Sequence, residues 1–142
     1  MTTKLFFERQ GRLLCRFCSV NNYLQKKYVT ATNIDMHFEQ FKKIHSFAVK
    51  ELTHNENGEN FITYLLELFS NRKHRVVDKN MKTYLLDHSR VPSFVCYNKT
   101  HCFVVLKSGA KFYRLDSLRM APEEISISIA YDIFKKLHCI IS

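Results

Sequence analysis

A thiol, an imidazole and a carboxylate stand at separate points of this chain, and together they could perform nucleophilic acyl chemistry. Cys15 lies near the start, whereas His101 and Asp116 flank a strand–turn–strand pattern much later. In thiol catalysis the thiolate attacks a carbonyl, the imidazole transfers protons and the carboxylate orients the imidazole. Gln10 lies five residues before Cys15, where a side-chain amide can help the Cys15 N–H stabilise an oxyanion.

The position of Cys15 in the first turn of a predicted helix favours a thiolate. Unpaired N–H groups and the helix dipole place positive potential there. Arg12 and Arg16 add positive charge nearby. A cysteine at a helix start that faces a histidine on a later strand is the arrangement of papain-like cysteine proteases.

The "CRFC" stretch that contains Cys15 and Cys18 has other interpretations. A structural zinc site needs a second short-spaced pair of ligands, and the later candidates are Cys96 with His101 or Cys102. A thioredoxin-like dithiol needs CxxC after a strand in a βαβ unit, whereas helices come first here. Inert buried thiols remain an alternative for both cysteines. For Cys18 inertness is the favoured interpretation, which makes the CxxC spacing accidental.

The stretch "HCFVVLKSGAKFYRLD" predicts a β-hairpin that brings His101 and Asp116 together. With Ser108 and Gly109 as the two-residue turn, Lys107 pairs with Ala110 and His101 faces Asp116. Directly opposed residues have Cβ atoms roughly 4.5–5.5 Å apart, so an imidazole–carboxylate hydrogen bond is expected. The alternative is a surface His–Asp pair without a catalytic role.

Helical patterns precede strand patterns along the chain, which predicts an α+β class with N-terminal helices packed on a mostly antiparallel sheet. The second predicted helix follows Asn33 or Thr32 as cap, the third follows Asn60, and the last opens at Pro122. The apolar face predicted for the second helix comprises Ile34, Phe38, Phe41, Ile44 and Ala48. The predicted helices are 14–28, from 34 onwards, 61–70 and 122–137, and the predicted strands are 74–78, 93–98, 101–107, 111–116 and 138–142.

Length and composition predict one domain, 1–142, in a reducing intracellular setting, cytoplasm or nucleus or both. The segment "MTTKLFFERQ" lacks the apolar run of a signal peptide, and no apolar stretch approaches the ~20 residues of a membrane span. The net charge is +9, but the basic residues are scattered, which favours a solvated surface over a nucleic-acid partner. We expect a monomer without cofactor or metal.

The ending "CIIS" fits a prenylation box at Cys139 and would anchor the protein to membranes. The favoured alternative is that Ile140 and Ile141 belong to the last strand of the sheet. A membrane partner is expected only if Cys139 is prenylated.

Four stretches of the chain resemble the Josephin family of cysteine deubiquitinases, the ataxin-type Josephin domain. The resemblance spans nearly the whole chain and includes the family's Gln-x4-Cys spacing, followed by Asn-Asn-x-Leu-Gln. The four stretches are "ERQGRLLCRFCSVNNYLQ", "GENFITYLLELF", "SFVCYNKTHCFVVLKSGAKFYRLDSL" and the "PEEIS" start of a helix with a closing apolar strand.

The resemblance implies a papain-like fold and a thiol-dependent hydrolase that cleaves after the C-terminal glycine of ubiquitin or a similar modifier. By motif, Cys15 is similar to the nucleophile, His101 to the general base and acid, Asp116 to the residue that orients the histidine, and Gln10 to the oxyanion glutamine. Ubiquitin or ubiquitinated proteins are the implied partners. The alternative is a Josephin-like module that binds ubiquitin with weak or no catalysis.

Four features depart from the family pattern. Asp116 stands where ataxin-type members have Asn, Cys102 where they tend to have Trp, and Cys18 where they have His. The helical arm at about 30–58 looks shorter than the family's arm. Because that arm helps to frame the ubiquitin site in the family, its length bears on affinity and linkage preference.

Overall fold

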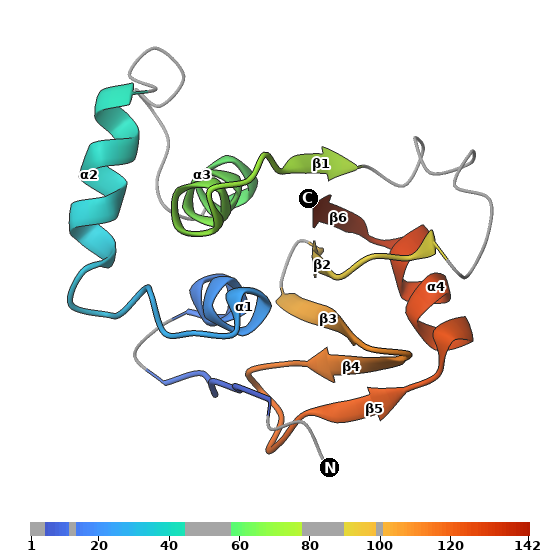
Figure 1. Ribbon diagram of the computed structural model, residues 1–142. Helices are drawn as coiled ribbons and strands as arrows, with labels where there is room; N and C mark the ends of the chain where they lie inside the picture. Colours follow the sequence, from blue (N-terminus) through green and yellow to red (C-terminus); the bar gives the residue numbers. More distant parts are fainter. Residues whose placement is uncertain (1–4, 12–13, 45–57, 78–89, 99–100) are drawn as a thin grey trace.

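Helices and an antiparallel sheet build the part of the chain that the computed structural model describes, which is residues 5–11, 14–44, 58–77, 90–98 and 101–142. Six strands form one sheet in the order β1-β6-β2-β3-β4-β5, and every neighbouring pair is antiparallel (Figure 1). In chain order the elements are α1 (Cys15–Leu24), α2 (Ile34–Ile44), α3 (Gly58–Ser70), β1 (Arg75–Val77), β2 (Phe94–Tyr97), β3 (Cys102–Ser108), β4 (Lys111–Leu115), β5 (Glu123–Ile125), α4 (Ile127–Lys136) and β6 (His138–Ile141). The predicted α+β class is confirmed.

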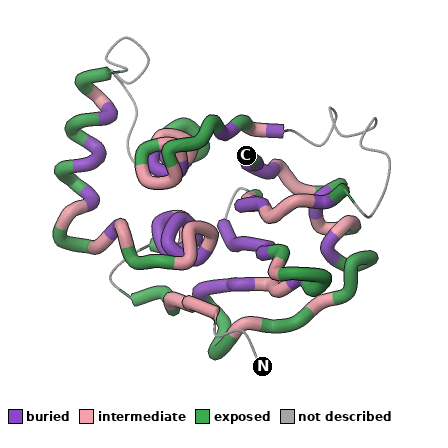
Figure 2. The backbone as a smooth tube through the Cα atoms, viewed as in Figure 1, coloured by how far each residue is buried: buried purple, intermediate pink, exposed green. Residues whose placement is uncertain are grey.

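Helices cover both faces of the sheet. Figure 1 shows α1 and α3 on one side, with α2 beyond them, and α4 on the other side. Strand β3 therefore has two buried faces, and the residues at both are apolar: Val104 and Leu106 belong to the core on the α1 side, whereas Phe103 and Val105 belong to the core on the α4 side. Figure 2 shows the buried positions gathered in α1 and the central strands. This two-sided burial explains the unbroken apolar run in the sequence.

Aromatic rings fill much of the core between the sheet and the N-terminal helices. The Phe61 ring from α3 packs edge-on against Phe17 of α1, with ring centroids 5.6 Å apart. Phe38 of α2 approaches the same ring at 5.1 Å. Because all three side chains are buried, the aromatic cluster joins α1, α2 and α3 to one another on the same side of the sheet.

The first and third helices differ from their predicted bounds. The first ends at Leu24, four residues early, because Gln25 adopts a left-handed conformation with φ 59°. Left-handed backbone ends a helix and is normally signalled by glycine or asparagine, so a glutamine at this position does not indicate the helix end. The third begins at Gly58, so Asn60 lies inside its first turn instead of capping it.

The second helix begins at Ile34 as predicted, directly after Asn33. Its predicted apolar face is only partly correct, because Ile44 is 61% exposed whereas Phe38 and Phe41 are buried. Ala48 lies outside the described residues, as does part of the predicted arm at 30–58.

The predicted helix over 122–137 proves to be a strand followed by a helix. Residues Glu123–Ile125 pair with β4 at the sheet edge as β5. Helix α4 then begins at Ile127, with the Ser126 hydroxyl accepting a hydrogen bond from the Ile129 N–H. The prediction failed because Pro122 suits an edge strand as well as a helix start.

Candidate active site

His101 and Asp116 meet at one end of the sheet. His101 directly precedes β3 and Asp116 directly follows β4. The imidazole Nε2 lies 2.8 Å from the Asp116 carboxylate Oδ1. The Asp116 side chain is only 5% exposed, whereas that of His101 is 19% exposed. The pair therefore combines a buried carboxylate with an imidazole that reaches the surface.

The hairpin that joins the two residues has a different register from the predicted one. Gly109 and Ala110 form the turn, so Ser108 pairs with Lys111 and Val104 with Leu115. Continuing this ladder by one step sets Phe103 opposite Asp116, and His101 reaches the carboxylate along the diagonal. The predicted direct pairing of His101 with Asp116 is thus wrong by two positions. A shift of two keeps both residues on one face, which is why the contact still forms.

The carboxylate of Asp116 is held by three donors. Besides His101, the Leu118 N–H donates to Oδ1 at 3.0 Å and the Arg114 guanidinium donates to Oδ2 at 3.3 Å. Burial opposes ionisation of this carboxyl, but the hydrogen bonds from Leu118, His101 and Arg114 and the charge of His101 outweigh it and lower the pKa of Asp116. Asp116 is therefore an anion at neutral pH and can orient an imidazole.

The backbone and ring of His101 are both fixed. Its N–H donates to the Asn98 side-chain oxygen at 2.9 Å, and its carbonyl accepts from the Asn98 N–H at 3.0 Å. The imidazole stacks on Phe103 with ring centroids 5.9 Å apart, and the Arg114 guanidinium lies 4.3 Å from the centre of the same Phe103 ring. These contacts restrict the ring to the rotamer that meets Asp116.

Cys15 is the first residue of α1 and is half-buried. The N–H groups of Phe17 and Cys18 both donate to the Leu14 carbonyl, at 3.0 Å each. The Cys15 N–H precedes these and has no acceptor within the helix, as at every helix start. The Cys15 carbonyl accepts from the Ser19 hydroxyl at 2.7 Å, which stabilises the first turn. The predicted position of Cys15 at a helix start is confirmed.

Cys102 shows that the start of α1 lies close to the His–Asp end of the sheet. Burial raises the pKa of the Cys102 thiol to about 12, and a hydrogen bond with Ser19 opposes this rise. Cys15 and Asp116 also lie close enough to raise the pKa of Cys102 electrostatically. Since Cys102 directly follows His101, the thiol of Cys15 and the His101–Asp116 pair share one neighbourhood.

Gln10 reaches the same neighbourhood through its backbone. The Gln10 N–H donates to the Ser117 carbonyl at 2.8 Å, so Gln10 lies beside the residue that follows Asp116. Gln10 is exposed. The structure thus brings Gln10 and Cys15 to the His101–Asp116 end of the sheet, while the catalytic roles of all four residues remain predictions.

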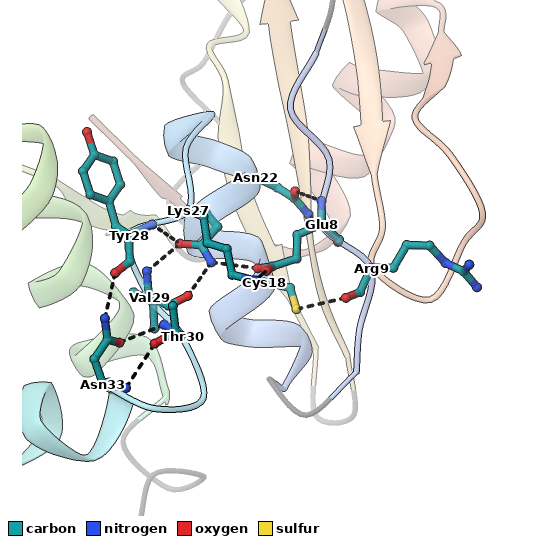
Figure 3. A network of polar contacts seen from close by, with 10 residues as sticks. Glu8, Arg9, Cys18, Asn22, Lys27, Tyr28, Val29, Thr30 and Asn33 are labelled. Carbon is teal, nitrogen blue, oxygen red and sulfur yellow. Dashed lines mark hydrogen bonds and ion pairs between the residues drawn. The ribbon is translucent and has the colours of Figure 1, made fainter.

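Asn22 and Gln25 of the Asn-Asn-x-Leu-Gln motif hold the N-terminal segment against α1. The Asn22 Oδ1 accepts from the Glu8 N–H at 2.7 Å, a contact visible in Figure 3. The Gln25 side chain accepts from the Phe6 N–H and donates to the Phe6 carbonyl, both at 2.9 Å. Gln10 is therefore positioned from the helix that begins with Cys15. The motif identified this helix in the sequence, but the residue types did not indicate that Asn22 and Gln25 hold the N-terminal segment against it.

Asn21 holds the connection between α1 and α2 from inside the protein. It is fully buried, and its Oδ1 accepts from the N–H groups of Tyr28 and Val29 at 3.0 and 2.9 Å. Its Nδ2 donates to the Val29 carbonyl and to the Glu8 carboxylate, both at 2.7 Å. The Asn33 side chain donates a hydrogen bond to the Tyr28 carbonyl in the same connection, as Figure 3 shows. All four hydrogen-bonding positions of the Asn21 amide are thereby used.

Three further predictions can be compared with the structure. Within the described ranges, no group of three or more His, Cys, Asp or Glu side chains is arranged to hold a metal ion. No helix in those ranges has both the length and the apolar character needed to cross a bilayer. Cys139 is fully buried in β6, paired with Val77 and Cys96, so prenylation would require this strand to leave the sheet.

The architecture is the papain-like α+β fold, with a thiol at the start of α1 and a His–Asp pair at the end of the adjoining hairpin. Within that class the chain belongs to the Josephin family, whose family model matches residues 10–139. Ataxin-3 from Gallus gallus is 27% identical over 143 aligned positions, which cover 86% of this chain and 39% of ataxin-3. The chain therefore spans about two fifths of the length of this relative.

Proposed function

We propose that this protein is a deubiquitinase that hydrolyses isopeptide or peptide bonds after the C-terminal glycine of ubiquitin or a related modifier. Membership of the Josephin family supports a ubiquitin-related role, because Josephin proteins are typically cysteine deubiquitinases. The observation that carries the proposal is the 2.8 Å contact between His101 and a buried, ionised Asp116, next to a helix that begins with Cys15.

In the proposed reaction, the Cys15 Sγ attacks the carbonyl carbon of the terminal glycine. The Cys15 N–H and the Gln10 side chain stabilise the oxyanion. Because Nε2 of His101 faces Asp116, the other ring nitrogen, Nδ1, serves the thiol. It accepts the proton of Cys15, donates it to the leaving lysine amine, and then activates water to hydrolyse the thioester.

Asp116 keeps the same role through both steps. Its lowered pKa keeps it ionised while the imidazole alternates between neutral and charged forms. A fixed carboxylate at Nε2 selects the tautomer with the proton on Nε2 and stabilises the imidazolium when it forms. Asn, which ataxin-type members have at this position, can fix the ring but offers no negative charge.

The decisive experiment compares the wild type with Cys15→Ala on a panel of modifier substrates and with a ubiquitin-based electrophile. The wild type should cleave and be labelled, whereas Cys15→Ala should fold normally by circular dichroism and lose at least about a thousandfold in kcat/KM. Cys18→Ser is the matched control, because it removes a thiol from the same turn and should keep its labelling.

Three results would contradict the proposal. A wild type that binds ubiquitin but neither cleaves nor becomes labelled would identify a binding module. Undiminished cleavage by Cys15→Ala would exclude Cys15 as the nucleophile. A product whose mass shows deamidation or transfer, instead of hydrolysis, would keep the thiol chemistry but change the reaction.

A further inference from the structure

The first turn of α1 contains a second thiol that the proposed hydrolysis does not use. Cys15 is the first helical residue and Cys18 follows three positions later. In an α-helix, Cα atoms three residues apart are separated by about 5 Å. Disulfides join Cα atoms roughly 4.4–6.8 Å apart, so the two cysteines satisfy the main distance requirement without movement of the backbone.

The two thiols differ sharply in access. Cys15 is half-buried, whereas Cys18 is 0% exposed, with its sulfur 3.9 Å from the Arg9 carbonyl (Figure 3). Burial, together with the charge of Glu8, raises the pKa of the Cys18 thiol to about 12. A dissolved oxidant therefore meets Cys15 first, because oxidation requires exposure and thiolate character.

We propose that Cys15 and Cys18 form a site of reversible oxidation by hydroperoxides, in which Cys18 converts oxidised Cys15 into an intrahelical disulfide. The proposal rests on the reactive Cys15 thiolate of the proposed function but not on ubiquitin as substrate. It assigns a chemical role to the CxxC spacing, which residue types alone predict to be accidental.

The reaction balances in two steps. The Cys15 thiolate attacks the peroxide, the O–O bond breaks, and Cys15 sulfenic acid forms while an alkoxide or hydroxide leaves and takes a proton from water. The Cys18 thiol then attacks the Cys15 sulfur, the S–O bond breaks, and the hydroxyl leaves as water with the proton of Cys18. Cys15 and Cys18 lose two electrons in total, and the peroxide gains them. A dithiol reductant reverses the reaction by exchange.

The raised pKa of Cys18 slows the second step but does not prevent it. Exchange rates depend on the thiolate fraction, which is small for this residue at neutral pH. The partner sulfur, however, is held in the same helical turn, and intramolecular proximity raises the effective concentration of the attacking group. Cys18 is thus a poor target for the oxidant itself and a well-placed partner for Cys15.

The other cysteines are less well placed to react with Cys15. Cys96 and Cys139 belong to the core on the α4 side of the sheet, away from α1. Cys102 lies on the α1 side and interacts electrostatically with Cys15, so it is the competing partner. A bond to Cys102 would have to join α1 to β3, whereas the bond to Cys18 stays within one turn.

The chemical consequence is protection of the nucleophile. Without a nearby thiol, a sulfenic acid is oxidised further to a sulfinic acid, which ordinary dithiols do not restore. With Cys18 available, oxidation stops at the disulfide, and the thiol returns when reductant is added. Oxidation would then switch the proposed hydrolase off without destroying it.

The test oxidises the folded wild type with hydrogen peroxide, blocks remaining thiols, and maps peptides without reduction. Trypsin cleaves after Arg16, so a Cys15–Cys18 bond should link peptide 13–16 to peptide 17–26. Before the remaining thiols are blocked, the intact mass should have fallen by about 2 Da, the loss expected for one disulfide, and dithiothreitol should reverse the change.

Cys18→Ser is the informative variant, because it removes the second thiol of the turn and keeps a small side chain at the same position. It should give a dimedone-reactive sulfenic acid at Cys15 and then a sulfinic acid, and dithiothreitol should restore less than about a tenth of the Cys15 thiol. Cys102→Ser is the matched control and should form the linked peptides as the wild type does.

Several results would overturn the proposal: no reaction of wild-type Cys15 with peroxide, oxidation without the linked peptides, a Cys15–Cys102 bond, or full recovery of Cys18→Ser. The outcome is separable from that of the proposed function. Linked peptides in a protein that a ubiquitin electrophile does not label would refute the hydrolase alone. Labelling without linked peptides would refute the oxidation site alone.

Discussion

The substitution Asp116→Asn changes one atom type at a buried carboxylate and tests how that carboxylate is held. In the native protein Oδ1 accepts from His101 and Leu118, while Oδ2 accepts from Arg114. An amide can keep its oxygen toward His101 and Leu118. Its NH₂ group then faces the Arg114 guanidinium, so an acceptor is replaced by a donor opposite another donor.

The expected cost follows from these contacts. A hydrogen bond to a charged group contributes about 1.5–3 kcal/mol when buried. The Asp116 side chain is 5% exposed, but that of Arg114 is 26% exposed, so solvent screens part of the interaction. We therefore expect Asp116→Asn to lower the free energy of unfolding by about 1–2 kcal/mol at pH 7.

The cost should depend on pH in a defined direction. The pKa of Asp116 is lower in the folded protein than its ordinary value of 3.8. A carboxyl with a depressed folded pKa contributes stability above its unfolded pKa and loses it as the pH falls through the folded value. The difference between wild type and Asp116→Asn should thus be constant at neutral pH and shrink below pH 3.8.

Urea denaturation followed by circular dichroism at several pH values measures the free energy of unfolding and its dependence on pH. Asp132→Asn is the matched control, because Asp132 pairs with Lys136 at 3.0 Å on the surface, with side chains 53% and 71% exposed. It should cost no more than about 0.5 kcal/mol. In an Arg114→Gln background, Asp116→Asn should cost at least about 1 kcal/mol less than in the wild type, because glutamine can accept from the new amide. Equal costs at positions 116 and 132, or no coupling to Arg114, would refute the reasoning.

Two further predictions concern the scaffold of the site. Asn21→Ala removes four hydrogen bonds and leaves the buried Val29 N–H and carbonyl unpaired, so it should lower the free energy of unfolding by about 2–4 kcal/mol; a loss below about 1 kcal/mol in urea would show that water or the loop replaces these contacts. Gly109→Ala should cost about 1 kcal/mol because Gly109 has φ +62°. Gly11→Ala, also in open space but without a positive φ, is its control, and equal thermal stability of the two variants would contradict the backbone argument.

The apolar pattern of the sequence located most of the strands, because strands that pack in the core consist mainly of apolar residues. The run that became β3 was found almost to the residue, since a strand buried on both faces needs consecutive apolar side chains. Short edge strands lack this signal. Glu123–Ile125 has two exposed glutamates and was absorbed into the following helix.

The backbone conformation of the turn sets the register of the β3–β4 hairpin, which the apolar pattern does not determine. Gly109 stands first in the hairpin turn with φ +62°, which moved the register by two positions from the prediction. The predicted contact between His101 and Asp116 nevertheless forms, because a register shift of two residues leaves both side chains on the same face of the sheet. The hydrogen-bond partners of Asn21 and Asn22 could not be predicted, because a buried amide needs partners but its residue type does not identify them.

The place of β6 in the sheet has a consequence for the order of folding. This strand lies between β1 and β2, and its pairs with them join residues far apart, such as Arg75 with Ile141 and Val95 with Ile140. The β3–β4 hairpin closes with a single short turn and already brings His101 to Asp116. Because local contacts form before distant ones, we expect the acid–base pair to assemble early and the sheet to close late. Proline-free hairpins of this kind form in microseconds, so the arrival of β6 and the docking of α1 should set the folding rate.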